Sequence, residues 1–314
     1  MPVSDFVLEC RKVSHWFDRQ KVLYDINLQI PRGQFVGLVG ASGCGKSTLL
    51  RAMLGTHPPR AGEVLMNGAA VCRPGRDRGI VYQRYALFPF LTALENVAFG
   101  PMLDQVGISG RLLGLWKWRK RRKAHLEQAE QRLTALGLHD ALHQYPAQLS
   151  GGMCQRVAIA QALIMQPEIL LLDEPFGALD EATREEQQTM LLSLRDENQR
   201  AREKGQRPPY TIVLVTHELN EAIYVADRVV SLSRHWLWQK EPGLTEHPGA
   251  TVVYDAATPS SPRDPHSKYA DFQAQRAEIR QAGFVPPGHG RNQFVRYWQE
   301  RPTGQSGRAP AGTI

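Results

Sequence analysis

The chain has 314 residues, with 38 lysines and arginines against 31 aspartates and glutamates, so its formal net charge is +7 and its isoelectric point lies near 9.3. Hydrophobic residues make up 42% and charged residues 22%, which is typical of a folded domain and excludes collagen-like, disulfide-scaffold and wholly disordered classes. No apolar run approaches the roughly 20 residues that span a bilayer. The first ten residues lack the pattern of a secretory signal.

The pattern of the first third of the chain predicts three strands, one helix and a fourth strand. Apolar residues recur at mostly two-residue spacing up to residue 30, a turn follows at Pro31-Arg32-Gly33, and Gly55 is placed to end the helix. The predicted elements are strands at 6–13, 23–30, 35–39 and 79–83 and a helix at 46–54.

The middle of the chain is mainly helical in pattern from Thr92 to about Met165, with leucines and alanines at three- and four-residue spacing. Two short apolar runs, Ile169 to Leu172 and Thr211 to Val215, predict buried strands. Continuous apolar strands that alternate with helices favour an α/β fold with a parallel sheet covered on both faces.

The amino-acid composition changes after Trp238. Residues 242–265 are rich in Pro, Ser, Thr and Gly and predict a linker, and residues 267–281 predict one amphipathic helix that Gly283 stops. From Pro286 onward the pattern is again that of a loop, and we expect part of it to be disordered.

A glycine-rich segment follows the strand at 35–39. It matches the pattern GxxxxGK[ST] and lies between an apolar strand and a helix, as a phosphate-binding loop requires, which disfavours an ordinary turn with a solvated lysine. Glycines let successive N–H groups turn inward around an anion, and the helix adds its positive N-terminal end. Lys46 then supplies a charge to the phosphates of ATP, and Ser47 a hydroxyl ligand for Mg²⁺. The predicted nucleotide-binding residues are Gly40, Ala41, Ser42, Gly43, Cys44, Gly45, Lys46, Ser47 and Thr48.

Two carboxylates, Asp173 and Glu174, follow the buried strand at 169–172. Ligands of open α/β sheets bind at the carboxyl ends of strands. We therefore expect Asp173 to hold Mg²⁺ and Glu174 to orient or deprotonate the attacking water. The alternative is an acidic cap on the next helix, which the phosphate-binding loop makes less favoured.

The segment Leu149-Ser150-Gly151-Gly152-Met153-Cys154-Gln155-Arg156 resembles the LSGGQ signature of ABC-type ATPases, with Met153 where many members carry Gln. Residues 6–240 carry further motifs in the family's order. The resemblance assigns Gln83 to the Q-loop, 178–180 to the D-loop with Asp180 contacting nucleotide, His217 to the switch position, and Phe17 to adenine stacking. Phe17 lies 29 residues before Lys46, and the neighbouring Trp16 is an alternative for the same role. Ser150 is also a good N-cap, and the two glycines after it expose N–H groups to an anion.

The resemblance implies a P-loop NTPase fold with a RecA-like parallel sheet core, an N-terminal antiparallel β subdomain and an inserted helical subdomain at about 92–165. It implies an ABC ATPase domain over 1–240 and leaves 241–314 as an extension of linker and short helix. It also implies a dimer that closes on two ATP–Mg²⁺, with the signature residues of one copy reaching the nucleotide of the other, and Gln83 as a further Mg²⁺ ligand. Catalysis is then expected from Lys46, Gln83, Glu174 and His217.

The expected function is that of an ATPase subunit on the cytoplasmic face of the cell membrane, with a transmembrane permease and a solute-binding protein as partners. The strings LSGGMCQRVAIAQAL, LLLDEPFGALD and THELNEAIYVADRVV look most like importers of the nitrate/sulfonate/taurine type. The alternatives are an ABC-type ATPase that acts on nucleic acid or ribosomes, and a P-loop kinase. The first would usually carry a long coiled coil or two cassettes, and the second would lack the signature and Gln83.

Two local features allow further hypotheses. Residues 111–132 hold eight lysines and arginines against two glutamates, so this stretch carries +6 of the net charge, whereas residues 241–314 are nearly neutral, with eight basic and seven acidic. The densest part, 116–123, is expected either at the membrane surface or the membrane partner, or on a solvated helix face.

The four scattered cysteines, Cys10, Cys44, Cys72 and Cys154, predict reduced thiols. Since Cys44 precedes a helix N-terminus, it is expected to be a reactive thiolate.

Overall fold

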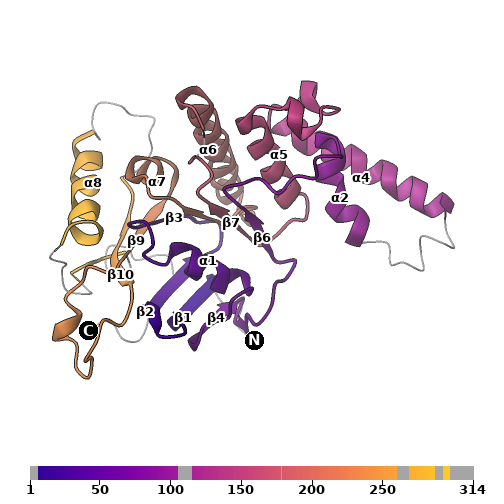
Figure 1. Cartoon of the computed structure of the whole chain (residues 1–314). Coiled ribbons are helices and arrows are strands. Elements are labelled where there is room, and N and C mark those ends of the chain that lie inside the picture. Colours follow the sequence, from indigo (N-terminus) through magenta and orange to yellow (C-terminus); the bar gives the residue numbers. More distant parts are fainter. Residues whose placement is uncertain (1–5, 105–114, 178, 260–268, 287–292, 298–314) are drawn as a thin grey trace. The chain divides into compact units, whose positions relative to one another are not determined.

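The computed structural model describes residues 6–104, 115–177, 179–259, 269–286 and 293–297 (Figure 1). By their internal contacts the residues divide into two compact units. Unit 1 comprises Met1–Gly75 together with Leu194–Ile314, and unit 2 comprises Arg76–Ser193. Helix α6, Glu181–Glu203, contributes residues to both units.

Unit 1 begins with an antiparallel sheet. Strand β1 pairs with β2 on one side and with β4 on the other, and the order across the sheet is β2-β1-β4-β5. Its strands are β1 Phe6–Phe17, β2 Gln20–Pro31, β4 Ala61–Met66 and β5 Ala69–Ala70. This is the N-terminal antiparallel subdomain that the sequence resemblance implies.

Unit 1 also contains five strands of a largely parallel sheet. Strand β3 is parallel to both β8 and β9, and it is buried at every residue. Their order is β11-β10-β9-β3-β8. The strands are β3 Phe35–Val39, β8 Ile212–Val215, β9 Arg228–Ser233, β10 Thr251–Ala257 and β11 Phe294–Val295. The predicted parallel core is therefore confirmed, and the predicted strand at 35–39 has the observed bounds.

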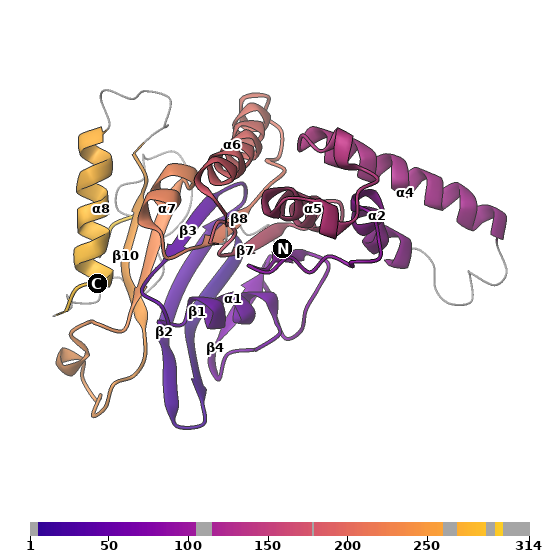
Figure 2. The same cartoon turned by 45° about the horizontal axis from the view of Figure 1, so that its top comes forward.

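Three further helices complete unit 1, α1 Lys46–Leu54, α7 Leu219–Val225 and α8 Tyr269–Gly283. Helix α1 ends at Gly55, which has a φ of +86° and donates its N–H to carbonyls of the last turn, as predicted. Helix α7 packs on β3, and α8 packs against α7, β9 and β10. Figure 2 shows α8 running beside β10.

The C-terminal extension contains more regular structure than the composition of the sequence predicts. The linker prediction for 242–265 is wrong over Thr251–Ala257, because β10 pairs antiparallel with β9 and is buried at six of its seven residues. The loop predicted from Pro286 also contains β11, which pairs with β10. The predicted helix is confirmed as α8. Residues 260–268 lie outside the described residues, and a domain boundary at residue 240 stays a prediction.

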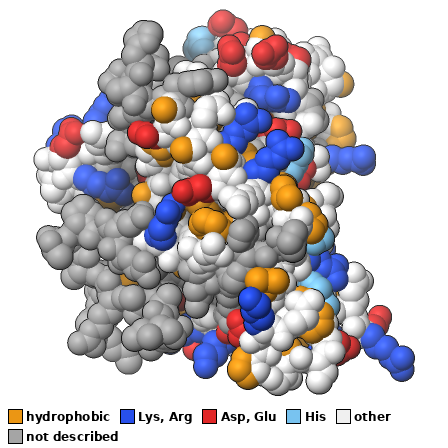
Figure 3. Space-filling model, turned by 90° about the vertical axis from the view of Figure 1, so that its left-hand side faces the viewer, with side chains coloured by type: hydrophobic (Ala, Val, Ile, Leu, Met, Phe, Trp, Pro, Cys, Tyr) orange, Lys and Arg blue, Asp and Glu red, His pale blue; other side chains and the backbone are white. Residues whose placement is uncertain are grey.

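A buried cluster of apolar side chains joins β10 and α8 to the rest of unit 1. Val253 and Tyr254 of β10 and Ile279 of α8 contact Val39 at the end of β3 and Ile223 of α7 through this cluster. Burial of apolar surface contributes about 25 cal/mol per Å². The extension therefore belongs to the same core as the strand that precedes the glycine-rich loop. From the side of α8, Figure 3 shows basic side chains interspersed with acidic and hydrophobic ones.

Unit 2 holds two parallel strands and a group of helices. Strand β6 pairs with β7, α5 packs on β6, and α2 packs against both α4 and α5. The elements are β6 Arg78–Val81, α2 Ala93–Asp104, α4 Leu115–Ala135, α5 Gly151–Leu163 and β7 Ile169–Asp173, with short 3₁₀ turns at His139–Ala141 and Pro146–Gln148. The mainly helical pattern predicted for 92–165 is confirmed over its described residues, and residues 105–114 lie outside them. Among the described residues, no helix is both long and apolar enough to cross a membrane.

Asn96 of α2 fixes the segment that follows β6. Its side chain is fully buried, and its amide oxygen accepts from the Phe88 N–H at 2.8 Å. Its amide nitrogen donates to the carbonyl oxygens of Phe88, Leu91 and Thr92 at 3.0–3.1 Å. The Asn96 side chain thus holds the loop between β6 and α2 to α2, and it satisfies backbone groups of the loop that have no strand partner.

Candidate functional site

The glycine-rich loop between β3 and α1 curls around the side chain of Lys46. This lysine is only 6% exposed, and its Nζ donates to the carbonyl oxygens of Gly40 at 2.8 Å and Ala41 at 3.2 Å. Ser47 is exposed and Thr48 half-buried in the first turn of α1. The ammonium group therefore lies inside the loop, beside the N-terminus of α1, where an anion is favoured.

Two glycines of this loop leave no room for a side chain. Gly40 has a φ of +155°, and a Cβ there would lie 2.4 Å from the carbonyl oxygen of Leu232. Gly45 has a φ of +103°, and its Cβ would lie 2.8 Å from the Leu23 side chain. At Gly43, with a φ of +74°, space is open and only the backbone angle favours glycine. The loop is consequently specified by its glycines, as the motif predicts.

The hypothesis that Cys44 is a reactive thiolate is wrong. The Cys44 side chain is 2% exposed, and burial raises the pKa of its thiol, although the nearby Lys46 charge acts in the opposite direction. Desolvation of a thiolate outweighs the attraction of one lysine and a helix N-terminus here. Cys44 is a packing residue of the loop.

We expect iodoacetamide to modify the exposed Cys72 of the native protein at least about tenfold faster than Cys44, because attack needs an accessible thiolate. Mass spectrometry of peptides after timed labelling measures both rates. The control is the protein unfolded in urea, in which both cysteines should react. Equal labelling of Cys44 and Cys72 in the native protein would contradict this account.

The other predicted residues of unit 1 are accessible. Phe17 at the end of β1 is 41% exposed and Trp16 is 38% exposed, so both stay candidates for stacking. The rings of Phe17 and His15 pack edge to face, with centroids 4.7 Å apart. His217 follows β8 with a half-exposed imidazole, whose Nε2 lies 3.6 Å from the Glu218 carboxylate.

In unit 2, Gln83 and Glu174 come together at Gly177. A Cβ at Gly177 would lie 3.2 Å from Nε2 of Gln83 and 3.7 Å from Oε2 of Glu174. Glu174 has a φ of +48°, a conformation that is uncommon for residues other than glycine, asparagine and aspartate and that clusters at functional sites. Asp173, the residue before Glu174, ends β7 and is half-buried. An amide and a carboxylate, which the sequence places 91 positions apart, thus border one small space.

The signature segment begins α5. Ser150 is its N-cap, and the Ser150 hydroxyl accepts from the N–H of Met153 at 3.2 Å, which confirms the predicted cap. Gly151 lies against the Tyr85 hydroxyl, which would be 2.9 Å from a Cβ. Gly152 is buried, and Gln187 of α6 donates to its carbonyl oxygen at 2.7 Å. The first turn of α5 is therefore braced from two sides.

We expect Gly152→Ala to destabilise the protein by about 1–3 kcal/mol, because the new Cβ would lie 2.1 Å from the Thr183 methyl group. Urea unfolding measures the loss. The matched control is the double variant Gly152→Ala with Thr183→Ser, which removes that methyl group but keeps the hydroxyl and should restore most of the stability. Equal stability of the single and double variants would show that the contact with Thr183 is not the cause.

Asp180 caps the N-terminus of α6. Its carboxylate accepts from the Thr183 N–H at 3.0 Å and from the Thr183 hydroxyl at 2.7 Å. The backbone hydrogen bond from Thr183, with its hydroxyl, holds the pKa of Asp180 below the ordinary value. Ala178 lies outside the described residues. The structure thus gives Asp180 a capping contact, and the predicted contact with nucleotide stays a prediction.

Sequence reasoning missed Tyr85, Thr183 and Gln187, which brace the signature turn. Only Thr183 carried a local signal, since it stands three residues after Asp180, the spacing of a helix cap. Within the residues that the structure describes, no three His, Cys, Asp or Glu side chains gather as a metal-binding cluster. The predicted Mg²⁺ ligands Ser47, Gln83 and Asp173 lie at the start of α1, after β6 and at the end of β7.

Comparisons with known proteins agree with the motifs. The family model described as ABC transporter matches residues 23–177. The nitrate import ATP-binding protein NrtD of Synechococcus elongatus is 41% identical over 215 residues, which cover 67% of this chain and 68% of that protein. The aliphatic sulfonates import ATP-binding protein SsuB 2 of Pseudomonas fluorescens is 42% identical over 223 residues, covering 71% and 72%.

Solved structures support the same assignment. The ATP-binding cassette MJ0796, a dimer in a post-hydrolysis state with ADP and Pi, is 29% identical and aligns with a TM-score of 0.58 over 80% of this chain and 99% of that chain. The glycine-rich loop with its buried lysine and the capped signature turn are the features that the motifs predict. The chain therefore belongs to the ABC transporter family and is an ATPase subunit of that family.

Proposed function

We propose that the chain hydrolyses ATP to drive a membrane importer for a small anion of the nitrate or aliphatic sulfonate type. The two relatives described above are named for those solutes, and the chain spans about 70% of each of them. The observation that carries the proposal is the phosphate-binding loop, in which Lys46 is buried against loop carbonyls. Such a lysine needs only to turn toward bound phosphates to exchange carbonyl oxygens for phosphate oxygens.

The residues of unit 1 are proposed to hold the nucleotide. Backbone N–H groups from Gly40 to Thr48 surround the phosphates, and Phe17, or Trp16 in its place, stacks on the adenine. The donor set suits Mg²⁺, which usually takes one or two carboxylates and completes its coordination with waters and substrate phosphates. We assign it to the Ser47 hydroxyl, the Gln83 amide oxygen and the Asp173 carboxylate. When bound, Mg²⁺ neutralises charge that develops on the transferred phosphoryl group.

Glu174 is proposed to orient the attacking water and accept its proton. The Gln83 amide beside it at Gly177 can donate to or accept from the same water without adding charge. Lys46 and His217 stabilise the charge on the phosphoryl oxygens by hydrogen bonding. Catalysis is then mostly positioning and electrostatics, as in other phosphoryl transfers.

The partners follow from the same proposal. We infer a two-fold dimer in which Ser150, Gly151, Gly152 and Asp180 of one copy face the nucleotide of the other, as an isologous interface requires. The solved cassette MJ0796 is a dimer. The dimer is proposed to lie at the cytoplasmic face of the cell membrane, bound to permease subunits that receive solute from a binding protein.

The test is reconstitution with the permease that copurifies with the chain. Proteoliposomes with ATP and Mg²⁺ inside should accumulate labelled nitrate or methanesulfonate, and Lys46→Ala should abolish both uptake and hydrolysis. Hydrolysis that is stimulated by neither solute would overturn the assigned solute class alone. Absence of hydrolysis with the permease present would overturn the proposed function, and copurification with RNA or ribosomes instead of a permease would replace it.

A further inference from the structure

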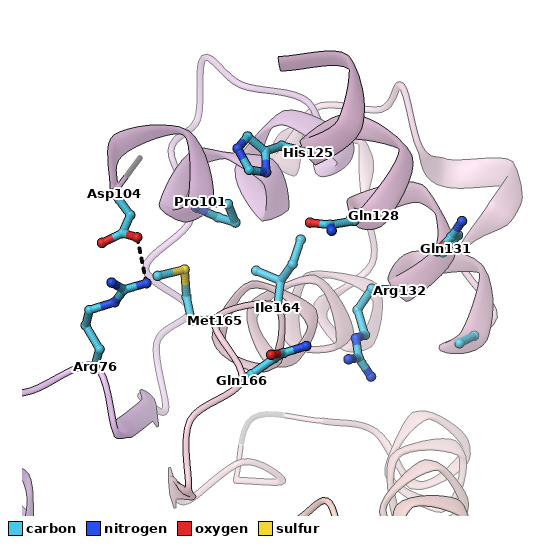
Figure 4. A pocket seen from close by; sticks show the side chains of 11 residues that line it. Arg76, Pro101, Asp104, His125, Gln128, Gln131, Arg132, Ile164, Met165 and Gln166 are labelled. Atoms are coloured by element: carbon cyan, nitrogen blue, oxygen red, sulfur yellow. Dashed lines mark ion pairs between the residues drawn. The ribbon is translucent and has the colours of Figure 1, made fainter. Parts of the chain in front are cut away.

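Unit 2 contains a cavity that none of the nucleotide-site residues line. It has a volume of about 590 Å³ and lies between α2, α4 and the residues that follow α5 (Figure 4). This volume is within the range of roughly 300–1,000 Å³ that is usual for small-molecule sites. Helix α4 supplies His125, Gln128 and Arg132 to its wall, at the three- and four-residue spacing that places side chains on one helix face.

His125 is the unusual side chain of this cavity. His125 is only 6% exposed, and its buried Nδ1 and Nε2 have no hydrogen-bond partner within the protein. A buried polar group without a partner costs free energy, so most such groups in folded proteins are paired. Figure 4 shows the ring near Pro101, at the same open space as Gln128 and Ile164. A ligand in the cavity would give the imidazole the partner that the protein does not provide.

The charges of the lining indicate the kind of ligand. Arg76 and Asp104 form an ion pair at 2.6 Å, so their charges offset each other. The lining residues include two arginines, Arg76 and Arg132, and one carboxylate, Asp104. The Arg132 guanidinium, the Gln128 amide and the imidazole N–H are all hydrogen-bond donors. Pro101 and Ile164 add apolar surface. This combination suits an anionic group on a short carbon body.

We propose that this cavity binds a small organic acid, whose carboxylate accepts hydrogen bonds from Arg132 and His125 and whose carbon body lies against Pro101 and Ile164. Charge-assisted hydrogen bonds of this kind are about twice as strong as neutral ones. The site is separate from the phosphate-binding loop, and the proposal does not depend on ATP hydrolysis or on the transported solute. It adds an effector site to the helical part of unit 2.

The probe is succinate, added to the purified full-length chain with saturating ADP so that the phosphate-binding loop is already occupied. Imidazole NMR signals and titration calorimetry measure binding. Succinate should shift one imidazole signal saturably, and that signal should be missing in His125→Leu. Arg132→Met should weaken binding by about tenfold or more. Inorganic phosphate, which has no carbon body, should bind about tenfold more weakly than succinate.

His125→Leu is expected to fold, because replacing an unpartnered polar group with an apolar one is neutral or stabilising when no ligand is present. His143→Gln, at an exposed histidine of the same unit, is the matched control and should bind succinate as the wild type does. The proposal is overturned if succinate binding is not saturable, or if Arg132→Met and His125→Leu bind it as tightly as His143→Gln. Equal affinity for phosphate would overturn the assignment to an organic acid.

Discussion

Glu174→Gln is expected to lower the steady-state rate of ATP hydrolysis by about 10²- to 10⁴-fold while ATP binding is retained. The amide keeps the shape of the side chain and its place beside Gln83 at Gly177, but it cannot accept the proton of the attacking water. Because the nucleotide is no longer cleaved, the variant should also accumulate as an ATP-bound dimer. Phosphate release and light scattering measure the rate and the association state.

The controls for this prediction separate binding from chemistry. Lys46→Ala should lose ATP affinity itself, because Lys46 supplies the charge inside the loop. Glu185→Gln changes an exposed glutamate of α6 in the same way and should leave the rate unchanged. Turnover of Glu174→Gln at the wild-type rate would remove Glu174 from the catalytic role, whereas normal turnover of Lys46→Ala would overturn the phosphate-binding loop.

The glycine-rich loop could be predicted from the sequence because its structure is local. Gly40 and Gly45 need positive φ angles and close neighbours, and Lys46 turns back onto carbonyls only five and six residues away. The same holds for Ser150, whose cap is made to a residue three positions on. Short-range backbone geometry dictates residue type at these positions, so a single sequence carries the signal.

Contacts between distant segments could not be predicted in this way. Gly152 is excluded from having a side chain by Thr183, and that pairing depends on how α5 packs on α6. The thiolate expected at Cys44 followed from its position near a helix N-terminus, but burial by surrounding residues decides its pKa. Local rules account for the loop's backbone, and the environment of its side chains needs the fold.

The strand β10 shows the same limit for the fold. Residues 242–265 have the average composition of a linker, and this average hid the run Thr251 to Ala257, whose valines and tyrosine favour a strand. Asp255 lies within this run and is buried. Its partner, Arg228, is 27 positions earlier, and only the pairing of β10 with β9 brings the two charges together.

Asp255→Ala is expected to destabilise unit 1 by about 3–5 kcal/mol, because it leaves a buried guanidinium without its counter-ion. Arg228 is fully buried and its Nε donates to Asp255 Oδ1 at 2.6 Å, while its Nη1 donates to the Gln29 carbonyl oxygen at 2.7 Å. The Tyr297 ring lies 3.9 Å from the guanidinium on another side. Urea unfolding, followed by circular dichroism, measures the change.

Two further variants show whether the unpaired charge is the cause. Arg228→Met combined with Asp255→Leu removes both charges, and since apolar pairs can replace buried ion pairs at little cost, it should recover most of the stability. Glu246→Gln breaks the exposed ion pair with Lys21 and should barely move the unfolding midpoint. If Asp255→Ala behaved like Glu246→Gln, the buried pair of Arg228 and Asp255 would contribute little to the stability of unit 1. A large loss that the double variant recovers would instead show that the buried pair of Arg228 and Asp255 holds β10 to β9. A truncation before Thr251 would then remove the Asp255 carboxylate from the buried Arg228 guanidinium and should destabilise unit 1 to a similar or greater extent.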